Sequence, residues 1–470
     1  MIELETSDIQ SLVFRGYRET PCARYVLLEI IDASRARTWL GRMAGTITIG
    51  ESRRYEVTTN LAVTARGLLA LGMPGPVLAT FSLEFHEGMS SKEHRSRILG
   101  DTGESAPMAW QWGGPGGAPV HLMLMVYAPD PASLEQSLAR HRAEYAGALR
   151  TTFVRDSITL PGRREHFGFA DGIAQPAIEG SSRAGPDAVR AGEFVLGYPN
   201  AYDKLPVSPS VPLTLDCEHH LLPLPGSDGS ARDLGRNGTY LVVRQLEQEV
   251  QAFWRAMTEY GRDPSGNFDR SEAIRLAAKC VGRWPSGAPL VSSPERDNPA
   301  YARENAFLYA ETDPHGLACP IGSHIRRTNP RDSLEPGPAE SLRVVDRHRI
   351  LRRGRSYGPP LEPFAQENEK AERGLFFICI NANIRRQFEF IQQTWSNNPK
   401  FGGLVEDKDP LIGDQPAQGG GTFTIPAAPV RRRLEGLARF VRVRGGEYFF
   451  LPSVRALRFL AALEGRFRGP

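Results

Sequence analysis

Three segments of the chain hold side chains whose types and spacing could support chemistry. The first is REHFGFADGIAQP, residues 164–176, in which Asp171 follows two phenylalanines and precedes Gly172. A carboxylate in an apolar loop loses hydration energy unless a cation, a proton or hydrogen bonds compensate it. The segment therefore predicts either an acid–base group or, because Asp-Gly is a common turn, a carboxylate that only accepts backbone N–H bonds.

The second segment is ACPIGSHIRRTNPRD, residues 318–332, with one histidine followed by three arginines. The neutral imidazole of His324 would be a good axial ligand for haem iron, and the arginines that flank it, Arg331 among them, could pair with haem propionates. On this segment alone, His324 could equally be an ordinary hydrogen-bonded histidine. The segment is compatible with a haem ligand and with a structural histidine.

The third segment is RVVDRHRILRRGRSYGPPLE, residues 343–362, which holds six arginines against one aspartate. Most of these arginines are expected to be solvated. Ile350 and Leu351 beside Arg352 indicate that part of the run enters the core, where a guanidinium needs an anionic partner. An anionic cofactor or reaction intermediate would provide that partner.

The elements that would position these residues alternate between strand and helix. Short apolar runs predict strands at 23–30, 120–128 and 374–382, and a shorter one at 193–198. Helical spacing of apolar residues predicts helices at 58–72, 245–260, 384–395 and 453–463, and another that starts at Asp130 and Pro131. A hairpin turning at Gly445-Gly446 is predicted within 437–453, and loops at 180–240, 328–345 and 403–422. The recurring order favours two α+β domains with mostly antiparallel sheets.

Length and composition exclude several classes of protein. The chain has 470 residues, which at about 150 residues per domain gives two or three domains. Apolar residues are 40% and charged residues 24%, as in globular proteins, and 47 glycines with 37 prolines predict many loops. A net charge of +3 is too small to make nucleic acid or an anionic membrane the main partner.

The cysteines and the first residues bear on the compartment. Five widely spaced cysteines without a C-x-x-C pair suit a reducing compartment and give no disulfide framework. The start, MIELETSDIQSLVF, carries acids and lacks the apolar region of a signal peptide. No apolar run reaches the roughly 18 residues that a membrane-spanning helix needs. The expectation is a cytoplasmic protein with no membrane partner.

The motifs, taken together, resemble those of the dye-decolourising peroxidase family. GFADG has the family's G-x-x-D-G form, CPIGSHIRRTNPRD resembles its proximal haem histidine segment, and RILRRGRSYGP resembles its distal arginine segment. Further similar segments follow in the same order: TFSLEFHEGM, AGEFVLGYPN, GRNGTYLVVRQLEQEVQAFW, VGRWPSGAPL, RGLFFICINANIRRQFEFIQQTW and GGEYFFLPS. They cover most of the chain, and the long loops are similar to those of the larger subclasses.

The resemblance implies a fold and a cofactor. It implies two ferredoxin-like α+β domains, 1–160 and 161–470, with one haem b per chain held mainly by the C-terminal domain. It also implies His324 as the proximal iron ligand, with Asp171 and Arg352 on the distal side. Arg349 and Arg353 are the rivals for the distal arginine, and the I-L-R order favours Arg352.

Further site residues follow from the same resemblance. A proximal histidine commonly donates its second N–H to a carboxylate, and Glu389 is the candidate acceptor unless it faces solvent on its helix. Leu375 and Phe377 lie two apart on a strand and share a face, so they line the distal pocket or pack in the core. Arg331 is the candidate partner for a haem propionate. Gly354 stands where many family members carry an asparagine, so no such side chain can act there.

The implied activity is that of a peroxidase that reduces hydrogen peroxide and oxidises dyes, phenols or other aromatic reductants through a ferryl intermediate. Asp171 would carry a proton between the peroxide oxygens, and Arg352 would stabilise the developing negative charge. Because an unperturbed aspartate has a pKa of about 3.9, an acidic optimum with dyes is expected. Tyr357 and Trp395 are candidates for oxidising bulky dyes at the surface, although core packing explains them too.

Other interpretations stay open at this point. The main alternative is a non-catalytic haem-binding or haem-handling protein, which would need neither Asp171 nor Arg352. Cys319 could ligate haem iron as a thiolate, but the nearby histidine and the family resemblance argue against it. Cys217, His219 and His220 could form a non-haem metal site, although a fourth ligand is missing. The physiological reductant and the oligomeric state are not indicated by the sequence.

Overall fold

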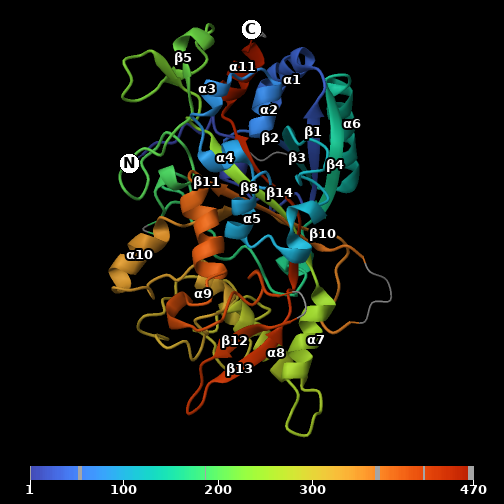
Figure 1. The fold of residues 1–470 in the computed structure, drawn as a ribbon, viewed down its shortest axis with the longest axis vertical. Helices are drawn as coiled ribbons and strands as arrows, with labels where there is room; N and C mark the ends of the chain where they lie inside the picture. Colours follow the sequence, from blue (N-terminus) through green and yellow to red (C-terminus); the bar gives the residue numbers. More distant parts are fainter. Residues whose placement is uncertain (1, 51–55, 186, 366–370, 417–418, 464–470) are drawn as a thin grey trace.

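The computed structural model describes residues 2–50, 56–185, 187–365, 371–416 and 419–463 (Figure 1). Its centre is a nine-stranded sheet in which all strand pairs are antiparallel. Two ferredoxin-like halves contribute to this sheet, and the chain is an α+β protein as expected. The domain boundary near residue 160 stays a prediction.

The first half of the sheet comes from the N-terminal part of the chain. Its strands are β1 (Cys22–Ile30), β2 (Thr58–Val63), β3 (Leu122–Ala128) and β4 (Leu149–Ile158), in the order β4-β1-β3-β2. Helix α1 (Ala33–Thr46) follows β1, and α6 (Pro131–Tyr145) follows β3. Asp130 caps α6 through the N–H of Ser133, and Pro131 lies in the first turn, as predicted. Short helices α2 (Ala65–Ala70), α3 (Gly75–Leu78), α4 (Leu83–Glu87) and α5 (Glu93–Leu99) link β2 to β3.

The second half repeats this order with longer connections. Strands β8 (Thr239–Gln248), β9 (Leu351–Arg352), β11 (Gly374–Asn381) and β14 (Val441–Leu451) pair in the order β14-β8-β11-β9. The longer helices are α7 (Val250–Tyr260), α8 (Arg270–Val281) and the wide helical turns Arg385–Glu389 and Ile391–Ser396, with α11 (Val454–Ala462) last. Both halves therefore have the strand order of a ferredoxin-like unit.

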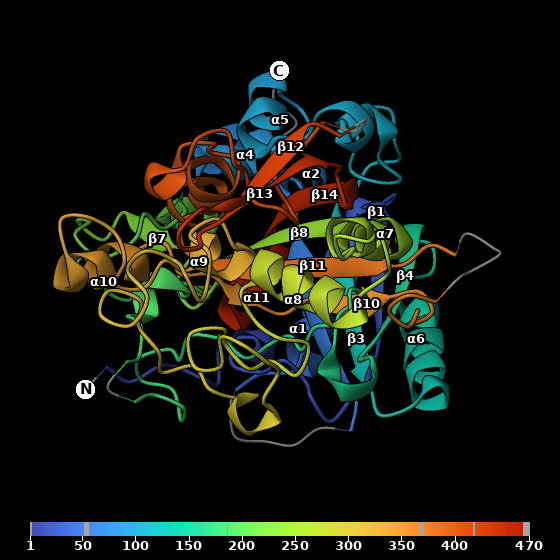
Figure 2. The same cartoon turned by 90° about the horizontal axis from the view of Figure 1, so that it is seen from below.

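The two halves close into a barrel. Strand β2 meets β14 where Val63 lies opposite Phe450, and strand β10 (Arg355–Tyr357) pairs with both β4 and β11. Inside, Tyr25 of β1 stacks on Phe376 of β11 with ring centroids 4.5 Å apart. Figure 2 shows β8, β11 and β10 side by side. The halves thus share one closed sheet.

The remaining elements lie outside the barrel. Helix α11 packs on α1, so the last helix covers the N-terminal half at the top of Figure 1. Helices α7 and α8 and the hairpin of β12 (Gly421–Ile425) and β13 (Arg432–Leu437) lie at the lower end. Short elements complete the chain: α9 (His324–Thr328), α10 (Pro338–Asp346), β5 (Ser210–Pro212), β6 (Leu222–Pro223) and β7 (Ala231–Asp233). No helix in the described part of the chain is long and apolar enough to span a bilayer.

Five expected elements are wrong. Residues 58–72 form strand β2, buried on both faces, and then α2, because Thr64 caps a new helix. The run 193–198 follows a short 3-10 turn and forms no strand. The predicted loop at 328–345 ends in helix α10, and the predicted helix at 245–260 begins only after β8. The expected hairpin is one continuous strand, β14, because Gly445 admits close contact with Trp112 and makes no turn. The strands near 23–30, 120–128 and 374–382 and the helices after Asp130, at 384–395 and at 453–463 are confirmed.

Candidate active site

Asp171 lies in a loop that hydrogen bonds hold in place. The carboxylate of Glu165 accepts hydrogen bonds from the backbone N–H groups of Phe167 at 2.9 Å and Phe169 at 3.0 Å. Gly172 follows with a φ of 77°, a conformation that favours glycine and turns the chain directly after Asp171. The Asp-Gly pair is thus a turn, but the loop is fixed by Glu165, which leaves the Asp171 side chain available for a partner outside the loop.

Arg352 is that partner, and the alternation of side chains along a strand selects it. Its Nη1 lies 2.9 Å from Oδ1 of Asp171. Arg353, the next residue, points the other way, and its guanidinium donates to the backbone carbonyl oxygens of Leu12 and Val13 at 2.7 Å each. The structure therefore pairs Asp171 with Arg352 and not with Arg353.

The charge on Arg352 controls the protonation of Asp171. Burial alone would raise the pKa of the carboxyl group, but the Arg352 guanidinium, the N–H of Gly172 and His324 outweigh it. Together they hold the pKa of Asp171 below its ordinary value. Asp171 is therefore a carboxylate at neutral pH. Its side chain is 39% exposed because it faces a cavity instead of packed side chains.

His324 is the first residue of α9, and a buried carboxylate fixes its ring. Nδ1 of His324 lies 2.9 Å from Oδ2 of Asp409, whose side chain is fully buried. The other oxygen of Asp409 accepts from the backbone N–H groups of Leu411 and Ile412. Burial raises the pKa of Asp409, but these contacts reverse the effect and lower it. With Nδ1 as the donor, Nε2 keeps its lone pair, and no residue within the described ranges hydrogen-bonds to it.

One cavity, here called the main cavity, connects the three groups. Asp171, Arg352 and His324 all line it. The His324 ring is near enough to Asp171 to lower the pKa of that carboxyl group. The rest of the wall is largely apolar and includes Val281, Ile325, Leu375, Phe377, Phe388, Ile391 and Leu411. A ligand in this cavity would thus lie between a free imidazole nitrogen and a carboxylate–guanidinium pair.

The donor set of the main cavity fits a haem. A neutral imidazole with a free Nε2 is an axial iron ligand, and the apolar wall suits a porphyrin ring. Haem propionates need cations, and Arg349 lines the cavity with a guanidinium that donates no hydrogen bond to any described residue. Burial lowers the pKa of Arg349 to about 10, still cationic at neutral pH. Arg331 also lines the cavity, although its guanidinium donates to Asn305 and to the Phe307 carbonyl.

The expected partner of His324, Glu389, lies elsewhere. Its Oε1 accepts hydrogen bonds from Nη1 of Arg95 at 2.6 Å and from the hydroxyl of Tyr448 at 2.7 Å. The expectation was wrong because the helical turn of Glu389 points its side chain toward α5 and β14. The carboxylate that contacts His324 is that of Asp409, which lies in a loop 85 residues after His324 in the sequence.

The structure also locates the remaining predicted residues. Leu375 and Phe377 share one face of β11 and line the main cavity beside Arg352. Tyr357 is 1% exposed and Trp395 is 5% exposed, so neither is the surface residue that direct oxidation of bulky dyes would require. Gly354 has no room for a side chain, since a Cβ there would lie 2.4 Å from the carbonyl oxygen of Phe376.

The alternative metal ligands find no support. Burial raises the pKa of the Cys319 thiol, which opposes a thiolate, and Cys319 is not among the residues that line the main cavity. His220 contacts Glu218, and the Cys217 thiol donates to a backbone carbonyl. Across the residues that the structure describes, no three His, Cys, Asp or Glu side chains gather as metal ligands.

Sequence reasoning missed Asp409 and left the roles of Arg349 and Glu165 undetermined. Asp409 lies in the loop KDPLIG, where the signal is an acid directly before Pro410 and the apolar pair Leu411 and Ile412. Arg349 was considered only as an alternative to Arg352 for the distal arginine. The arginine-rich segment 343–362 does not indicate which guanidinium remains without a partner in the folded chain. Glu165, six residues before Asp171, was visible in the motif but its role as the brace of the loop was not.

Comparison with known proteins agrees with this geometry. A family model described as Dyp-type peroxidase, C-terminal, matches residues 226–430. A dye-decolorizing peroxidase of Exidia glandulosa is 29% identical over 97% of this chain and 86% of its own length. A multifunctional dye peroxidase of an Amycolatopsis species is also 29% identical, over 91% of this chain and 90% of its own.

Solved structures of dye-decolorizing peroxidases are similar to this chain as well. The crystal structure of a fungal DyP-type peroxidase from Auricularia auricula-judae superposes with a TM-score of 0.79 at 26% identity, covering 98% of this chain and 100% of that chain. An ancestral D-type dye-decolorizing peroxidase superposes with a TM-score of 0.77 at 28% identity, covering 97% and 99%. In sequence and in fold, the chain is similar over nearly its whole length to the dye-decolourising peroxidases, a family of haem enzymes.

Proposed function

We propose that this haem peroxidase reduces hydrogen peroxide, that His324 would hold the haem iron, and that Asp171 and Arg352 would act on the peroxide. The observation that carries the proposal is the placement of an Asp171–Arg352 pair and a free imidazole nitrogen in one cavity. The full-length relatives carry peroxidase names, which favours catalysis over non-catalytic haem binding.

The chemistry assigned to Asp171 is proton transfer. Bound haem would supply an iron that accepts oxidising equivalents from peroxide. The carboxylate of Asp171 removes the proton from one peroxide oxygen and returns it to the other, so that the O–O bond breaks and water leaves. Because the Arg352 guanidinium lowers the pKa of Asp171, the base form persists in mildly acidic solution. Two electrons from aromatic reductants, together with two protons, would then complete the reduction of the second peroxide oxygen to water.

The remaining residues position these groups. The Arg352 guanidinium faces the oxygen on which negative charge develops as the O–O bond lengthens. The Asp409 carboxylate accepts the Nδ1–H of His324, which orients the ring and makes it a more basic ligand. Arg349, with Arg331 beside it, is the proposed anchor for the propionates. Leu375 and Phe377 keep the space beside Arg352 small and apolar.

The test is an absorption spectrum of the haem-loaded protein before and after one equivalent of peroxide. The native protein should show a histidine-type ferric Soret band that shifts within milliseconds to seconds. Asp171→Asn should keep the ferric band but slow the shift by about 100-fold or more, because it removes the proton carrier. His324→Ala should fail to hold haem in the same form.

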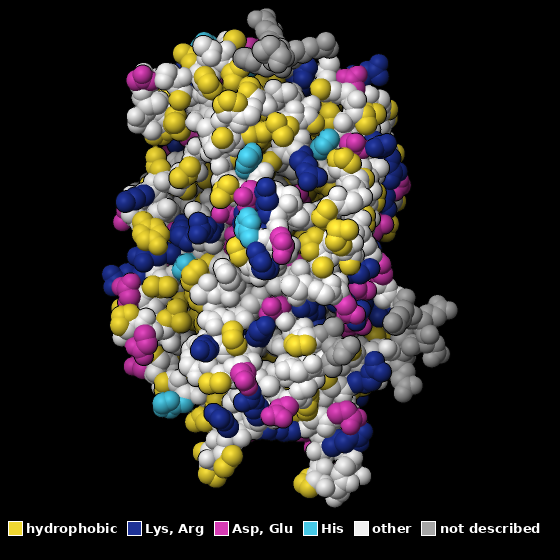
Figure 3. Space-filling model, viewed as in Figure 1, with side chains coloured by type: hydrophobic (Ala, Val, Ile, Leu, Met, Phe, Trp, Pro, Cys, Tyr) yellow, Lys and Arg dark blue, Asp and Glu magenta, His cyan; other side chains and the backbone are white. Residues whose placement is uncertain are grey.

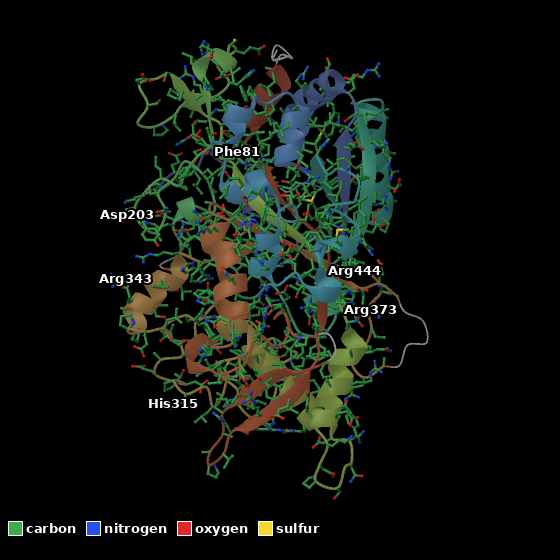
Figure 4. All side chains as sticks on the ribbon, viewed as in Figure 1. Phe81, Asp203, His315, Arg343, Arg373 and Arg444 are labelled. Carbon is green, nitrogen blue, oxygen red and sulfur yellow. The ribbon has the colours of Figure 1, made fainter. Side chains whose placement is uncertain are left out.

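A matched variant controls for loss of charge. Asp203→Asn removes an exposed carboxylate that pairs with Arg190, far along the surface at the left edge of Figure 4. It should react with peroxide at the native rate. A native-like rate in Asp171→Asn would refute the proton-transfer role, and a Soret band that ignores peroxide in the native protein would favour haem handling instead.

A cytoplasmic location is a further part of the proposal. All five cysteines are unpaired in the structure, and Cys217 is exposed. Free exposed thiols persist most easily in a reducing compartment. Thiol titration of protein isolated from its own cells should therefore find the thiols reduced, and a mixed disulfide at Cys217 would contradict the proposal.

A further inference from the structure

A second pocket, here called the outer pocket, meets the main cavity at the catalytic pair. Asp171 and Arg352 line both, together with Leu375 and Phe377. His324 lines only the main cavity. The outer pocket therefore reaches the Asp171–Arg352 pair from the side away from the proximal histidine.

The wall of the outer pocket is strongly basic. Eight arginines line it, and its acidic lining residues are Asp171 and Glu165. Four of the arginines have partners within the protein: one pairs with Asp171, and the other three donate to backbone carbonyl oxygens. These four are Arg352, Arg164, Arg353 and Arg355.

The other four arginines have no such partner. Arg18, Arg163, Arg183 and Arg303 are exposed, and no residue in the described ranges forms a hydrogen bond or ion pair with their guanidinium groups. They come from distant parts of the sequence, so the fold gathers them. Partial burial lowers the pKa of Arg18, and the other three guanidinium groups lower it further, so all three are near enough to act on the charge of Arg18.

Such a cluster is costly unless an anion occupies it. Like charges that face one pocket repel, and a bound anion would relieve the repulsion of all four at once. The excess of arginines in the outer pocket does not reflect the charge of the whole protein. The net charge is only +3, and the face in Figure 3 mixes basic and acidic side chains. The four arginines thus form a local site of positive potential.

We propose that the outer pocket binds anionic aromatic reductants, such as aryl sulfonates or carboxylates, beside the Asp171–Arg352 pair. The proposal rests on the proposed peroxidase function and adds the residues that would hold the anionic group of the reductant, namely Arg18, Arg163, Arg183 and Arg303. Each reductant loses one electron, and two electrons with two protons reduce one hydrogen peroxide to two water molecules. No bond to the protein forms, so the pocket needs only to hold the anionic group and leave the ring near the haem.

Kinetics of two reductants test the proposal. The variant is Arg163→Gln/Arg303→Gln in the haem-loaded full chain, assayed with ABTS, a sulfonated reductant, and with guaiacol, a neutral phenol. At low ionic strength, kcat/KM for ABTS should fall about tenfold, because charge in a cleft raises the local concentration of an oppositely charged substrate. Guaiacol should change little, and added salt should remove the difference.

The matched control removes the same charge elsewhere. Arg97→Gln/Arg343→Gln replaces two arginines, each with a side chain 68% exposed, and Figure 4 shows Arg343 at the edge of the molecule on α10. This variant should keep native kinetics with both reductants. Equal losses for ABTS and guaiacol in the pocket variant, or no loss at all, would overturn the proposal.

A binding measurement separates this proposal from the function on which it rests. Calorimetry with naphthalene sulfonate, which the enzyme need not oxidise, should show binding to the haem-loaded native protein that is about tenfold weaker in the pocket variant. Equal binding to both, or binding of inorganic sulfate without naphthalene sulfonate, would overturn the pocket assignment. Failure of the proposed function would appear instead as a native spectrum that ignores peroxide, whatever calorimetry finds.

Discussion

Two carboxylates, those of Asp171 and Asp409, each contact a different residue that lines the main cavity. Asp171 faces the Arg352 guanidinium and Asp409 faces the His324 ring, and the surrounding contacts lower the pKa of both. An ionised acceptor against Nδ1–H increases the electron donation of the imidazole to a metal. In the proposed function, Asp409 would act through His324 on the haem iron, and Asp171 would act on the peroxide.

If Asp409 makes His324 a stronger ligand, its replacement should change the reduction potential of the bound haem. Asp409→Asn should raise the reduction potential of the bound haem, because an amide oxygen is a weaker acceptor for Nδ1–H than a carboxylate. Peroxidase activity should fall about 10- to 100-fold, as is typical when the partner of a metal-binding histidine is replaced. Spectroelectrochemical titration measures the potential directly.

Glu389→Gln is the informative control for Asp409→Asn. This carboxylate pairs with Arg95 and Tyr448, so its replacement should lower stability and leave the potential unchanged. A potential that moves in Glu389→Gln but not in Asp409→Asn would contradict the assignment.

The sequence could single out Asp171, His324 and Arg352, which the structure brings to one cavity, because each lies in a short motif; their roles stay predictions. It could not identify Asp409, which reaches His324 across 85 residues through a loop without periodicity. The same limit explains Glu389: a helix position shows that a side chain is near, but its direction depends on the packing of α5 and β14. Arg349 was undetermined because pairing within a basic run depends on tertiary contacts.

Among the secondary-structure elements, strands that are continuous apolar runs were predicted correctly. Strands were missed where burial on both faces or close contacts at glycine hide the alternation of apolar and polar residues. Strands β1, β3 and β11 read as apolar runs. Residues of β2 mimic helical spacing because both faces of the strand are buried. Gly445 and Gly446 look like a turn, yet they lie inside β14, where Trp112 and Met89 leave no space for a side chain.

The backbone packs so closely at Gly354 that a side chain there should destabilise the sheet. An alanine Cβ would lie 2.4 Å from the carbonyl oxygen of Phe376 and 2.9 Å from the backbone nitrogen of Ile378. Gly354→Ala should therefore push β9 and β10 away from β11 and cost about 1–3 kcal/mol of unfolding free energy. Urea titration measures that cost. Gly116→Ala, at an exposed glycine with nothing within 4 Å of its Cβ, should change stability far less. Equal effects of the two would contradict this account.

At the scale of the whole molecule, stability is linked to protonation through Glu165. Burial raises its pKa from 4.5 to about 7, and hydrogen bonds from Phe167, Phe169 and Gln248 only partly oppose the shift. The folded chain therefore holds a proton on Glu165 between pH 4.5 and about 7 that the unfolded chain releases. Unfolding free energy should fall as pH rises through this window.

The corresponding prediction compares two proteins across pH. The native protein should lose about 3 kcal/mol relative to Glu165→Gln between pH 4.5 and 7, since the amide cannot ionise. Chemical denaturation at several pH values, with both proteins loaded with haem, measures this difference. A constant difference would show that Glu165 has an ordinary pKa.

The closure of the barrel by β10 also sets the order of events during synthesis. Arg353 and Arg355 donate to the backbone carbonyl oxygens of Leu12, Val13 and Tyr17, which lie between 338 and 341 residues away. At roughly 10 residues per second, a ribosome needs on the order of half a minute to add those residues. Until then these three carbonyl oxygens lack the arginine donors that they have in the folded protein. The haem pocket, which needs Arg352 next to them, can form only when most of the chain has left the ribosome.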